Sequence, residues 1–215
     1  MKPRMPAVLL SLLIGGSVAW AQPPTSVGGE FQVNTYTTND QYGPSVAMDS
    51  NGDFQVVWTS YGSYGTDTNS SIQVQRYAAD GTPLGGEFQV NSYVFGGQKY
   101  PQVTMASGGA FVVTWASTAG SGTDANWSVQ MRRLSADGMV LGQDFQVNTF
   151  TSGYQQHPAV STTPSKEIAV VWQGGYDDPV KYYQYGIWGQ RFDEDLLFAT
   201  GLEFGDLSGW SATVP

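Results

Sequence analysis

Acidic residues recur at one loop position of this chain, and they are the first feature that could do chemistry. Asp67 and Asp124 hold equivalent positions in two similar segments, and Asp177 lies near the corresponding place further along. Oxygen-rich loops suit Ca²⁺, which takes six to eight hard ligands. The alternative is a polar surface loop closed by Asx-turns. The spacing matches no established calcium loop, so the sequence favours the surface loop and leaves Ca²⁺ as the one cofactor to consider.

Three arginines, Arg76, Arg133 and Arg191, occupy equivalent places in three similar segments. Guanidinium groups bind carboxylates bidentately, so such a trio could hold an acidic sugar. A residue repeated once per structural unit more often ties neighbouring units together, by pairing with Asp or Glu or by bonding carbonyls. We therefore predict a structural role for the three arginines.

Aromatic residues outside the repeated positions are the best candidates for a binding surface. Exposed rings among Asn, Gln and Asp stack on sugars or anchor protein partners, and loops on rigid scaffolds often carry function. The alternative is loop packing over a small core. The candidates are Tyr61, Tyr64, Phe95, Trp127, Tyr176, Tyr182 and Tyr183.

Nucleophilic and metal-assisted catalysis find little support. His157 is the single histidine, and cysteine is absent. His157 precedes Pro158 where the equivalent positions hold Gly43 and Tyr100, which predicts a variable loop site. A Ser–His–Asp triad or a zinc site would need support for this histidine that the chain does not supply. Glycoside hydrolysis needs only two carboxylates, but no Asp or Glu pair stands apart, so the sequence indicates no catalytic residue.

The elements that must position these residues repeat at a fixed step. Three segments, GEFQVNTY, GEFQVNSY and GQDFQVNTF, place Phe31, Phe88 and Phe145 at equal intervals along the chain. A strict period marks one supersecondary unit copied three times, here at about 28–84, 85–141 and 142–200. Tryptophans that keep the same step are predicted to be scaffold residues: Trp58, Trp115 and Trp172.

In each copy apolar residues recur at every second position, and the positions between them are mixed, which predicts β-strands. In the first copy we expect three strands, over 44–48, 54–58 and 72–77. The fourth strand is the opening motif of the next copy, with Phe88 and Val90 facing inward and Glu87, Gln89 and Asn91 facing out. The prediction is an all-β domain of three four-stranded antiparallel units.

Four-stranded units repeated along a chain are typical of β-propeller blades. The repeat interval is longer than the roughly 40 to 50 residues of common propeller repeats. Closed propellers have four to eight blades, so three units predict a propeller-like array that is open, partial or closed by self-association into a homo-oligomer. A β-trefoil and a β-prism also use four strands per unit and stay as alternatives.

The N-terminus predicts export. A basic start at Met1–Arg4 precedes an apolar run from Ala7 to Val18 and the segment Ala19-Trp20-Ala21. This pattern is typical of a signal peptide over residues 1–21. The apolar run is shorter than the roughly 20 residues of a spanning helix, so we expect no membrane span after cleavage. The protein should be secreted or on the cell surface, with the periplasm as an alternative.

Charge and composition narrow the partners. The net charge of −9 argues against nucleic acid and anionic membranes, which attract basic patches. Charged residues make up 13% and aromatic residues 13% of the chain, which is typical of an extracellular β protein rather than a disordered tail. The partners that remain are a glycan or a cell-surface protein.

The string P-x-V-x₅-G-x-F-x-V-x-W from Pro44 to Trp58, followed by I-x-x-Q-R-Y and an Asp-Gly turn, resembles a repeat of large secreted bacterial surface proteins. This resemblance covers residues 28–192 and implies a propeller-like fold and no catalytic activity. The segment GLEFGDLSGW, residues 201–210, resembles a GFESGDLSAW element near the ends of exported bacterial proteins. We expect 201–215 to be a tail or an edge strand.

These observations predict a repeat domain over residues 22–200 that binds a glycan or a protein partner through its inter-strand loops and catalyses no reaction. A sialidase-like or other glycoside hydrolase is the first alternative. A structural spacer of a cell-surface protein is the second.

Overall fold

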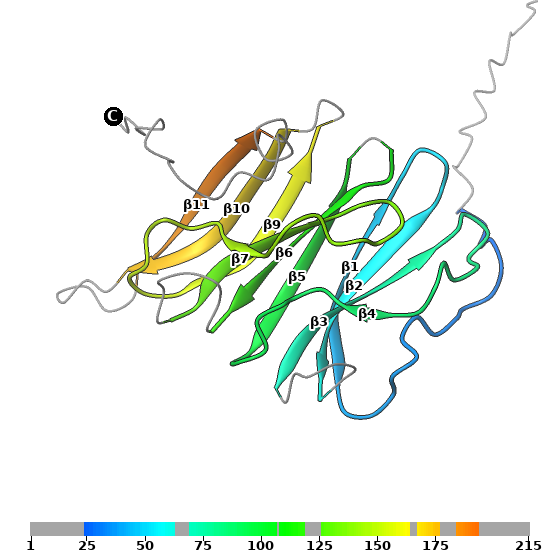
Figure 1. The fold of residues 1–215 in the computed structure, drawn as a ribbon, viewed down its shortest axis with the longest axis horizontal. Helices are drawn as coiled ribbons and strands as arrows, with labels where there is room; N and C mark the ends of the chain where they lie inside the picture. Colours follow the sequence, from blue (N-terminus) through cyan, green and yellow to red (C-terminus); the bar gives the residue numbers. More distant parts are fainter. Residues whose placement is uncertain are drawn as a thin grey trace, which may run out of the picture. The chain divides into compact units, whose positions relative to one another are not determined.

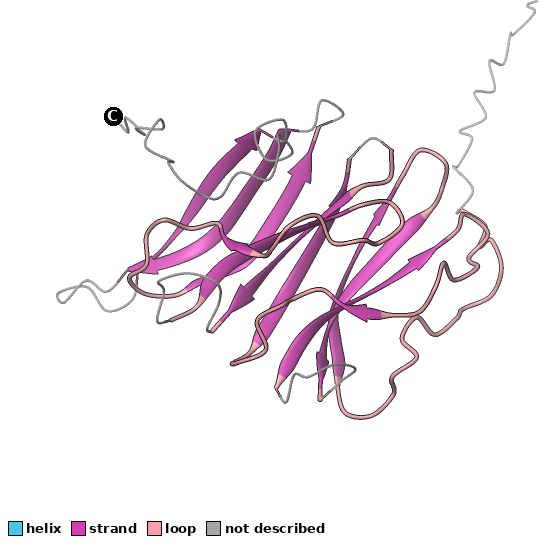
Figure 2. Cartoon of the chain, in the orientation of Figure 1, coloured by secondary structure: helices cyan, strands magenta, loops and turns pink. Residues whose placement is uncertain are grey.

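The computed structural model describes residues 24–62, 69–106, 108–118, 126–163, 167–176 and 184–193. Over these residues the chain forms β-strands and no helix (Figure 2), which confirms the all-β prediction. The described part of the chain accordingly has no helix that could cross a membrane. Two compact units divide the chain, Met1–Phe31 and Gln32–Pro215, and the strands among the described residues lie in the second.

The strands form three antiparallel sheets that follow the three sequence copies (Figure 1). Strands that follow one another in the chain are neighbours in each sheet. The first sheet contains β1 (Gln41–Met48), β2 (Phe54–Tyr61), β3 (Ser70–Tyr77) and β4 (Phe88–Gln89). The second contains β5 (Gln98–Met105), β6 (Phe111–Ser117), β7 (Ser128–Leu134) and β8 (Phe145–Gln146). The third contains β9 (Gln155–Thr162), β10 (Glu167–Tyr176) and β11 (Gln184–Asp193).

Polar turns close the hairpins. Asp49 Oδ1 accepts hydrogen bonds from the backbone N–H groups of Asn51 (2.8 Å) and Asp53 (3.0 Å), which fixes the β1–β2 turn. After β3 and β7, Gly81 and Gly138 take φ values of +85° and +86°, a conformation that costs glycine little.

The fourth strands are shorter than the sequence predicts, because an asparagine side chain replaces part of the backbone ladder. After β4 the Val90 N–H still donates to Ile72 O (2.7 Å), but the Ile72 N–H donates to Asn91 Oδ1 (2.8 Å). The prediction that Glu87 and Asn91 face outward is wrong, since they are 7% and 3% exposed. Both are buried because they bond backbone groups, which satisfies them away from water.

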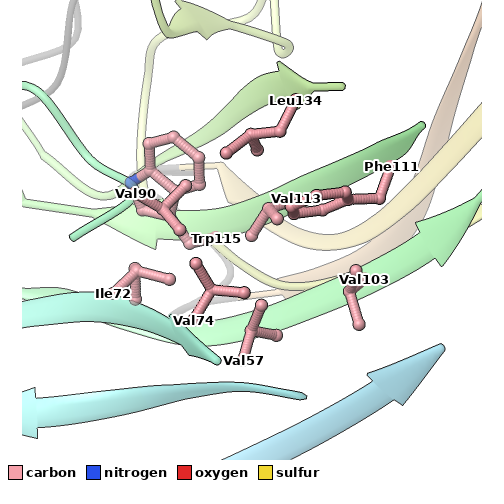
Figure 3. Packing of buried hydrophobic residues seen from close by; sticks show 9 residues of the cluster. All are labelled: Val57, Ile72, Val74, Val90, Val103, Phe111, Val113, Trp115 and Leu134. Carbon is pink, nitrogen blue, oxygen red and sulfur yellow. The ribbon is translucent and has the colours of Figure 1, made fainter. Parts of the chain in front are cut away.

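Consecutive sheets pack face to face through apolar side chains. Val57, Ile72, Val74 and Val90 from the first sheet and its β4 extension meet Phe111, Val113, Trp115 and Leu134 of the second (Figure 3). A second cluster joins the other face of the second sheet to Ile168, Val170 and Trp172 of the third. The second sheet therefore packs against a neighbouring sheet on both of its faces.

Strands β1, β5 and β9, the first of each sheet, are neighbours in turn, β1 contacting β5 and β5 contacting β9. Face-to-face sheets with adjacent first strands form a propeller-like arrangement, rather than the trefoil or prism considered above. Among the described residues no hydrophobic cluster joins the third sheet to the first. Any fourth strand from residues 201–215 lies outside the described residues.

The repeated tryptophans are buried, each bonded to a glutamine of the preceding first strand. The indole N–H groups donate to glutamine Oε1 atoms 17 positions earlier, over 2.9 to 3.0 Å: Trp58 to Gln41, Trp115 to Gln98 and Trp172 to Gln155. This bond anchors the first strand of each sheet to the second.

The repeated arginines differ from one another. Arg76 Nη1 donates to Ala136 O (2.8 Å) in the next copy, so it ties two sheets. Arg191 instead pairs with Glu167 (3.1 Å) within its own sheet, where both side chains are exposed. Arg133 also has a partner.

Candidate functional site

A backbone irregularity recurs at the start of each first strand. The pairing of β1, β5 and β9 with their neighbours shifts register around Pro44, Pro101 and Pro158. Proline lacks an N–H for the ladder, so strands that contain it bulge or lie at edges. β-Bulges re-aim side chains and are frequent beside binding sites.

The residue before each of these prolines has a positive φ: Gly43 (+64°), Tyr100 (+58°) and His157 (+51°). Glycine adopts this conformation readily, but for tyrosine or histidine it costs on the order of 1–3 kcal/mol. Strain of this kind persists where the surrounding structure over-determines it, and it clusters at ligand sites. The prediction that His157 lies in a loop is wrong, because it lies within β9.

The bulges bring an aromatic and cationic cluster together at the ends of the first strands. The Tyr100 ring centroid lies 4.2 Å from His157 and 6.3 Å from Trp127. The Tyr42 and Tyr61 rings stack at 5.7 Å. These residues come from all three sequence copies, so the propeller-like packing assembles the cluster.

Lys99 holds the centre of this cluster. Its Nζ atom lies 5.7 Å from the Tyr61 ring centroid and 5.8 Å from that of Trp127, which is the range of a cation–π interaction. A hydrogen bond with Lys99, followed by one with Tyr42, lowers the pKa of Tyr61. Burial, followed by the hydrogen bond with Tyr61, raises the pKa of Tyr42. The pKa values of these two neighbouring hydroxyls are therefore shifted in opposite directions, that of Tyr61 downward and that of Tyr42 upward.

A groove of about 260 Å³ lies beside Lys99. Aromatic rings, hydroxyls, an amide and backbone face it together: Tyr61, Asn69, Ser70, Gly96, Gly97, Lys99, Thr118 and Trp127. Such a mixture offers a stacking surface together with hydrogen-bond donors and acceptors.

The structure brings together two of the aromatic residues singled out above, Tyr61 and Trp127. Phe95 is 69% exposed and packs against Tyr93. Tyr176 ends β10. The other aromatic candidates and the three aspartates lie outside the described residues: Tyr64, Tyr182, Tyr183, Asp67, Asp124 and Asp177.

Sequence reasoning missed Lys99, Tyr42 and the strained Tyr100. One signal in the sequence was available. The position before the repeated proline holds a different residue in each copy, Gly43, Tyr100 or His157, while the residues around it repeat. We interpreted this variation as a loop, although a scaffold that holds a varied residue at a fixed place is also how binding sites are built.

Most described carboxylates serve the scaffold. Glu87 accepts hydrogen bonds from the N–H groups of Thr35 (2.6 Å) and Tyr36, and Asp144 accepts from the Ser92 N–H (3.1 Å). Others bond turn backbone or an arginine: Asp49, Asp53, Asp80, Asp137 and Glu167. Among the residues that the structure describes, no three His, Cys, Asp or Glu side chains gather as a metal site.

No family model and no curated protein sequence matches the chain. Several solved structures match in part. One is a Hadza microbial sialidase, with a TM-score of 0.49, 15% identity, and coverage of 68% of this chain and 34% of the sialidase. Another is an endo-arabinase from Bacteroides thetaiotaomicron, with a TM-score of 0.44, 16% identity, and coverage of 68% and 55%.

An endo-1,4-β-xylanase from the same species has a TM-score of 0.45, 12% identity, and coverage of 73% of this chain and 61% of the xylanase. The chain thus spans about a third to three-fifths of the length of these structures. At such identities the likeness concerns the fold and carries no information about the groove.

Proposed function

We propose that the protein is an exported, non-enzymatic module that binds a glycan in the groove around Lys99. The observation that carries this proposal is the position of the Lys99 ammonium between the rings of Tyr61 and Trp127, on the wall of an open groove. Signal-directed secretion and a place at the cell surface belong to the same proposal.

The chemistry of the groove favours a sugar over an apolar ligand. A pyranose has an apolar face that stacks on an aromatic ring and hydroxyls at its rim that need polar partners. Trp127 and Tyr61 supply the rings, while Asn69, Ser70 and Thr118 supply amide and hydroxyl groups. The volume of about 260 Å³ is small, so the groove would hold one or two sugar units of a longer chain.

The charge of the protein favours a neutral glycan. Lys99 is a single cation already engaged by two aromatic faces, and the chain as a whole carries −9. A polyanionic glycan would be repelled as it approached. Lys99 would instead donate hydrogen bonds to sugar hydroxyls.

The use of the carboxylates favours binding without hydrolysis. Glycoside hydrolysis requires two carboxyl groups facing each other across the scissile bond. Glu87 and Asp144 are 7% and 4% exposed, and their oxygens accept hydrogen bonds from backbone N–H groups of the scaffold. None of the described residues that line the groove is acidic.

A glycan array followed by calorimetry on the best neutral ligand tests the proposal. Trp127→Ala should weaken binding at least tenfold, because truncating a central aromatic contact costs about 2 kcal/mol or more. Trp188→Ala, which removes a 44% exposed tryptophan on the third sheet, is the matched control and should change affinity less than twofold.

Two results would overturn the proposal. The first is the absence of any glycan ligand on the array. The second is release of reducing sugar when the purified protein is incubated with the ligand, because this would show hydrolysis. Equal loss of affinity in Trp127→Ala and Trp188→Ala would move the site away from the groove.

A further inference from the structure

The sheets pack in one direction along the chain, so each sheet has a leading face and a trailing face. The leading face carries Val46, Met48 and Trp58 and their equivalents in later copies. The trailing face carries Val57 and Ile72 and their equivalents. The trailing face of the first sheet contacts the leading face of the second, and the same contact joins the second sheet to the third.

The leading face of the first sheet is partly uncovered. Val46 is 61% exposed, whereas its equivalent Val103 in the second sheet is 7% exposed. Met48 is 62% exposed, whereas its equivalent Met105 packs against the core. The difference arises because the second sheet has a sheet before it and the first has none among the described residues.

The trailing face of the third sheet is uncovered in the complementary way. Ile72 and Val129 are fully buried, but their equivalent Ile187 is 79% exposed. Val57 is fully buried, but its equivalent Val171 is 45% exposed. The same contact between a trailing face and a leading face is buried between the first and second sheets and again between the second and third. The first sheet therefore exposes part of a leading face, and the third sheet exposes part of a trailing face that could pack against it.

A short segment around Val33 is already in place on the leading face of the first sheet. Val33 packs against Val56, Trp58 and Tyr77, as Val90 packs against the leading face of the second sheet. The Tyr77 hydroxyl donates to Val33 O (2.9 Å). Residues 32–34 thus lie where a fourth strand of a preceding sheet would lie, yet in the described chain they pair with no strand.

The asparagine of this segment has the local conformation of its equivalent. Asn34 Nδ2 donates to Tyr36 O (2.8 Å), as Asn91 Nδ2 donates to Tyr93 O (2.9 Å). In the paired copy the Asn91 Oδ1 atom accepts the Ile72 N–H of the third strand. The N–H of Ile187, on the outer edge of β11, is the equivalent donor, and β11 ends its sheet among the described strands.

We propose that two copies of this chain associate head to tail, with residues 32–34 of one copy adding a fourth strand to β11 of the other. Val46 and Met48 would then pack on Val171 and Ile187 of the second copy. Exposed edges of this kind bind a further strand readily, and a strand held in place before binding loses little entropy. Head-to-tail contacts make rings when the rotation closes, and two such contacts give six sheets, within the four to eight of closed propellers.

The mass of the purified full chain in solution, measured by light scattering from 1 to 100 µM, tests this proposal. A dimer is expected in the upper part of this range. A monomer throughout would overturn the proposal, and would mean that the edge of β11 is covered from within the chain, for which residues 201–215 are the available segment. A mass that keeps rising with concentration would overturn the closed pair.

Two variants test the polarity of the contact. Val46→Glu changes only the leading face, and Ile187→Glu only the trailing face, and each should weaken self-association by at least a hundredfold. Met139→Glu is the matched control, since Met139 is 66% exposed in a turn and belongs to neither face; it should stay dimeric. Circular dichroism identifies any variant that fails to fold.

Mixing the two variants gives the decisive result. Val46→Glu has an intact trailing face and Ile187→Glu an intact leading face, so a mixed pair keeps one contact intact, while its other contact carries both substitutions. The mixture should therefore form a one-to-one complex that is weaker than the wild-type pair and that neither variant forms alone. No complex in the mixture, or a dimer that survives Val46→Glu, would show that the contact is not head to tail. These measurements contain no glycan, so their failure is independent of the proposed function.

Discussion

Removing one partner of the Trp115–Gln98 hydrogen bond should destabilise the protein, whereas removing both should cost much less than the sum. Trp115 is fully buried and Gln98 is 1% exposed, with 2.9 Å between the indole Nε1 and the amide Oε1. Water cannot replace either partner at this depth. The bond fixes β5, which lies in the middle of the array, so its loss should be felt by the whole domain.

The magnitude follows from the cost of an unpaired buried group. Gln98→Leu leaves the indole N–H without its acceptor, and Trp115→Phe leaves the amide oxygen without its donor; each orphaned group costs about 1–3 kcal/mol. Trp115→Phe also loses apolar contacts, but this loss occurs in the single and the double variant alike. The double variant should therefore be more stable than the sum of the singles predicts, by about 1–3 kcal/mol.

Urea unfolding followed by tryptophan fluorescence or circular dichroism gives the four free energies of the cycle. Gln41 and Trp58 provide the internal control, because their bond is 3.0 Å long but Gln41 is only half-buried, so solvent can substitute and the coupling should be below about 1 kcal/mol. Additive single effects at Trp115 and Gln98, within about 0.5 kcal/mol, would refute the reasoning.

Three further predictions follow from single contacts. Lys99→Met should raise the pKa at which Tyr61 ionises, because Lys99 is the main cause of its lowering; ultraviolet titration of the phenolate checks this, and an unchanged curve contradicts it. Gly138→Ala should destabilise the protein more than Gly81→Ala. Both glycines have a positive φ, but only at Gly138 would the added Cβ meet a side chain, with Arg76 Nε at 2.9 Å. Equal unfolding midpoints would argue against close packing of Arg76 on Gly138. Asp144→Ala should cost about 1.5–3 kcal/mol, because the buried Asp144 carboxylate accepts a hydrogen bond from the Ser92 N–H and hydrogen bonds to charged groups contribute about this much. A loss below about 0.5 kcal/mol in urea unfolding would show that water replaces the carboxylate.

The fold class could be predicted because the repeat and the strand periodicity are properties of the sequence itself. Phe54, Val56 and Trp58 recur at every second position, which places them on one face of a strand, and the constant repeat interval shows which segments adopt the same structure. Burial of the acidic residue at the head of each fourth strand could not be predicted. Glu87 and Asp144 look like surface residues in the sequence. Only the packing of one copy on the next brings the N–H groups whose hydrogen bonds they accept.

The candidate site shows the same limit. Tyr61 and Trp127 could be selected as aromatic residues off the repeat pattern, but Lys99 looks like an ordinary charged residue of a strand. Its place between two rings depends on the bulge at Tyr100 and Pro101 and on the contact between β1 and β5. Periodicity gives the face that a side chain occupies, and it gives no information about which copies meet at the strand ends.

The most direct test of glycan binding at Lys99 is a titration followed through the indole N–H resonances of the protein. Addition of the best neutral ligand from the array should shift the Trp127 resonance saturably and leave that of the buried Trp115 unchanged. Saturable binding that leaves the Trp127 resonance in place would contradict the account, because the ligand would then lie elsewhere on the molecule.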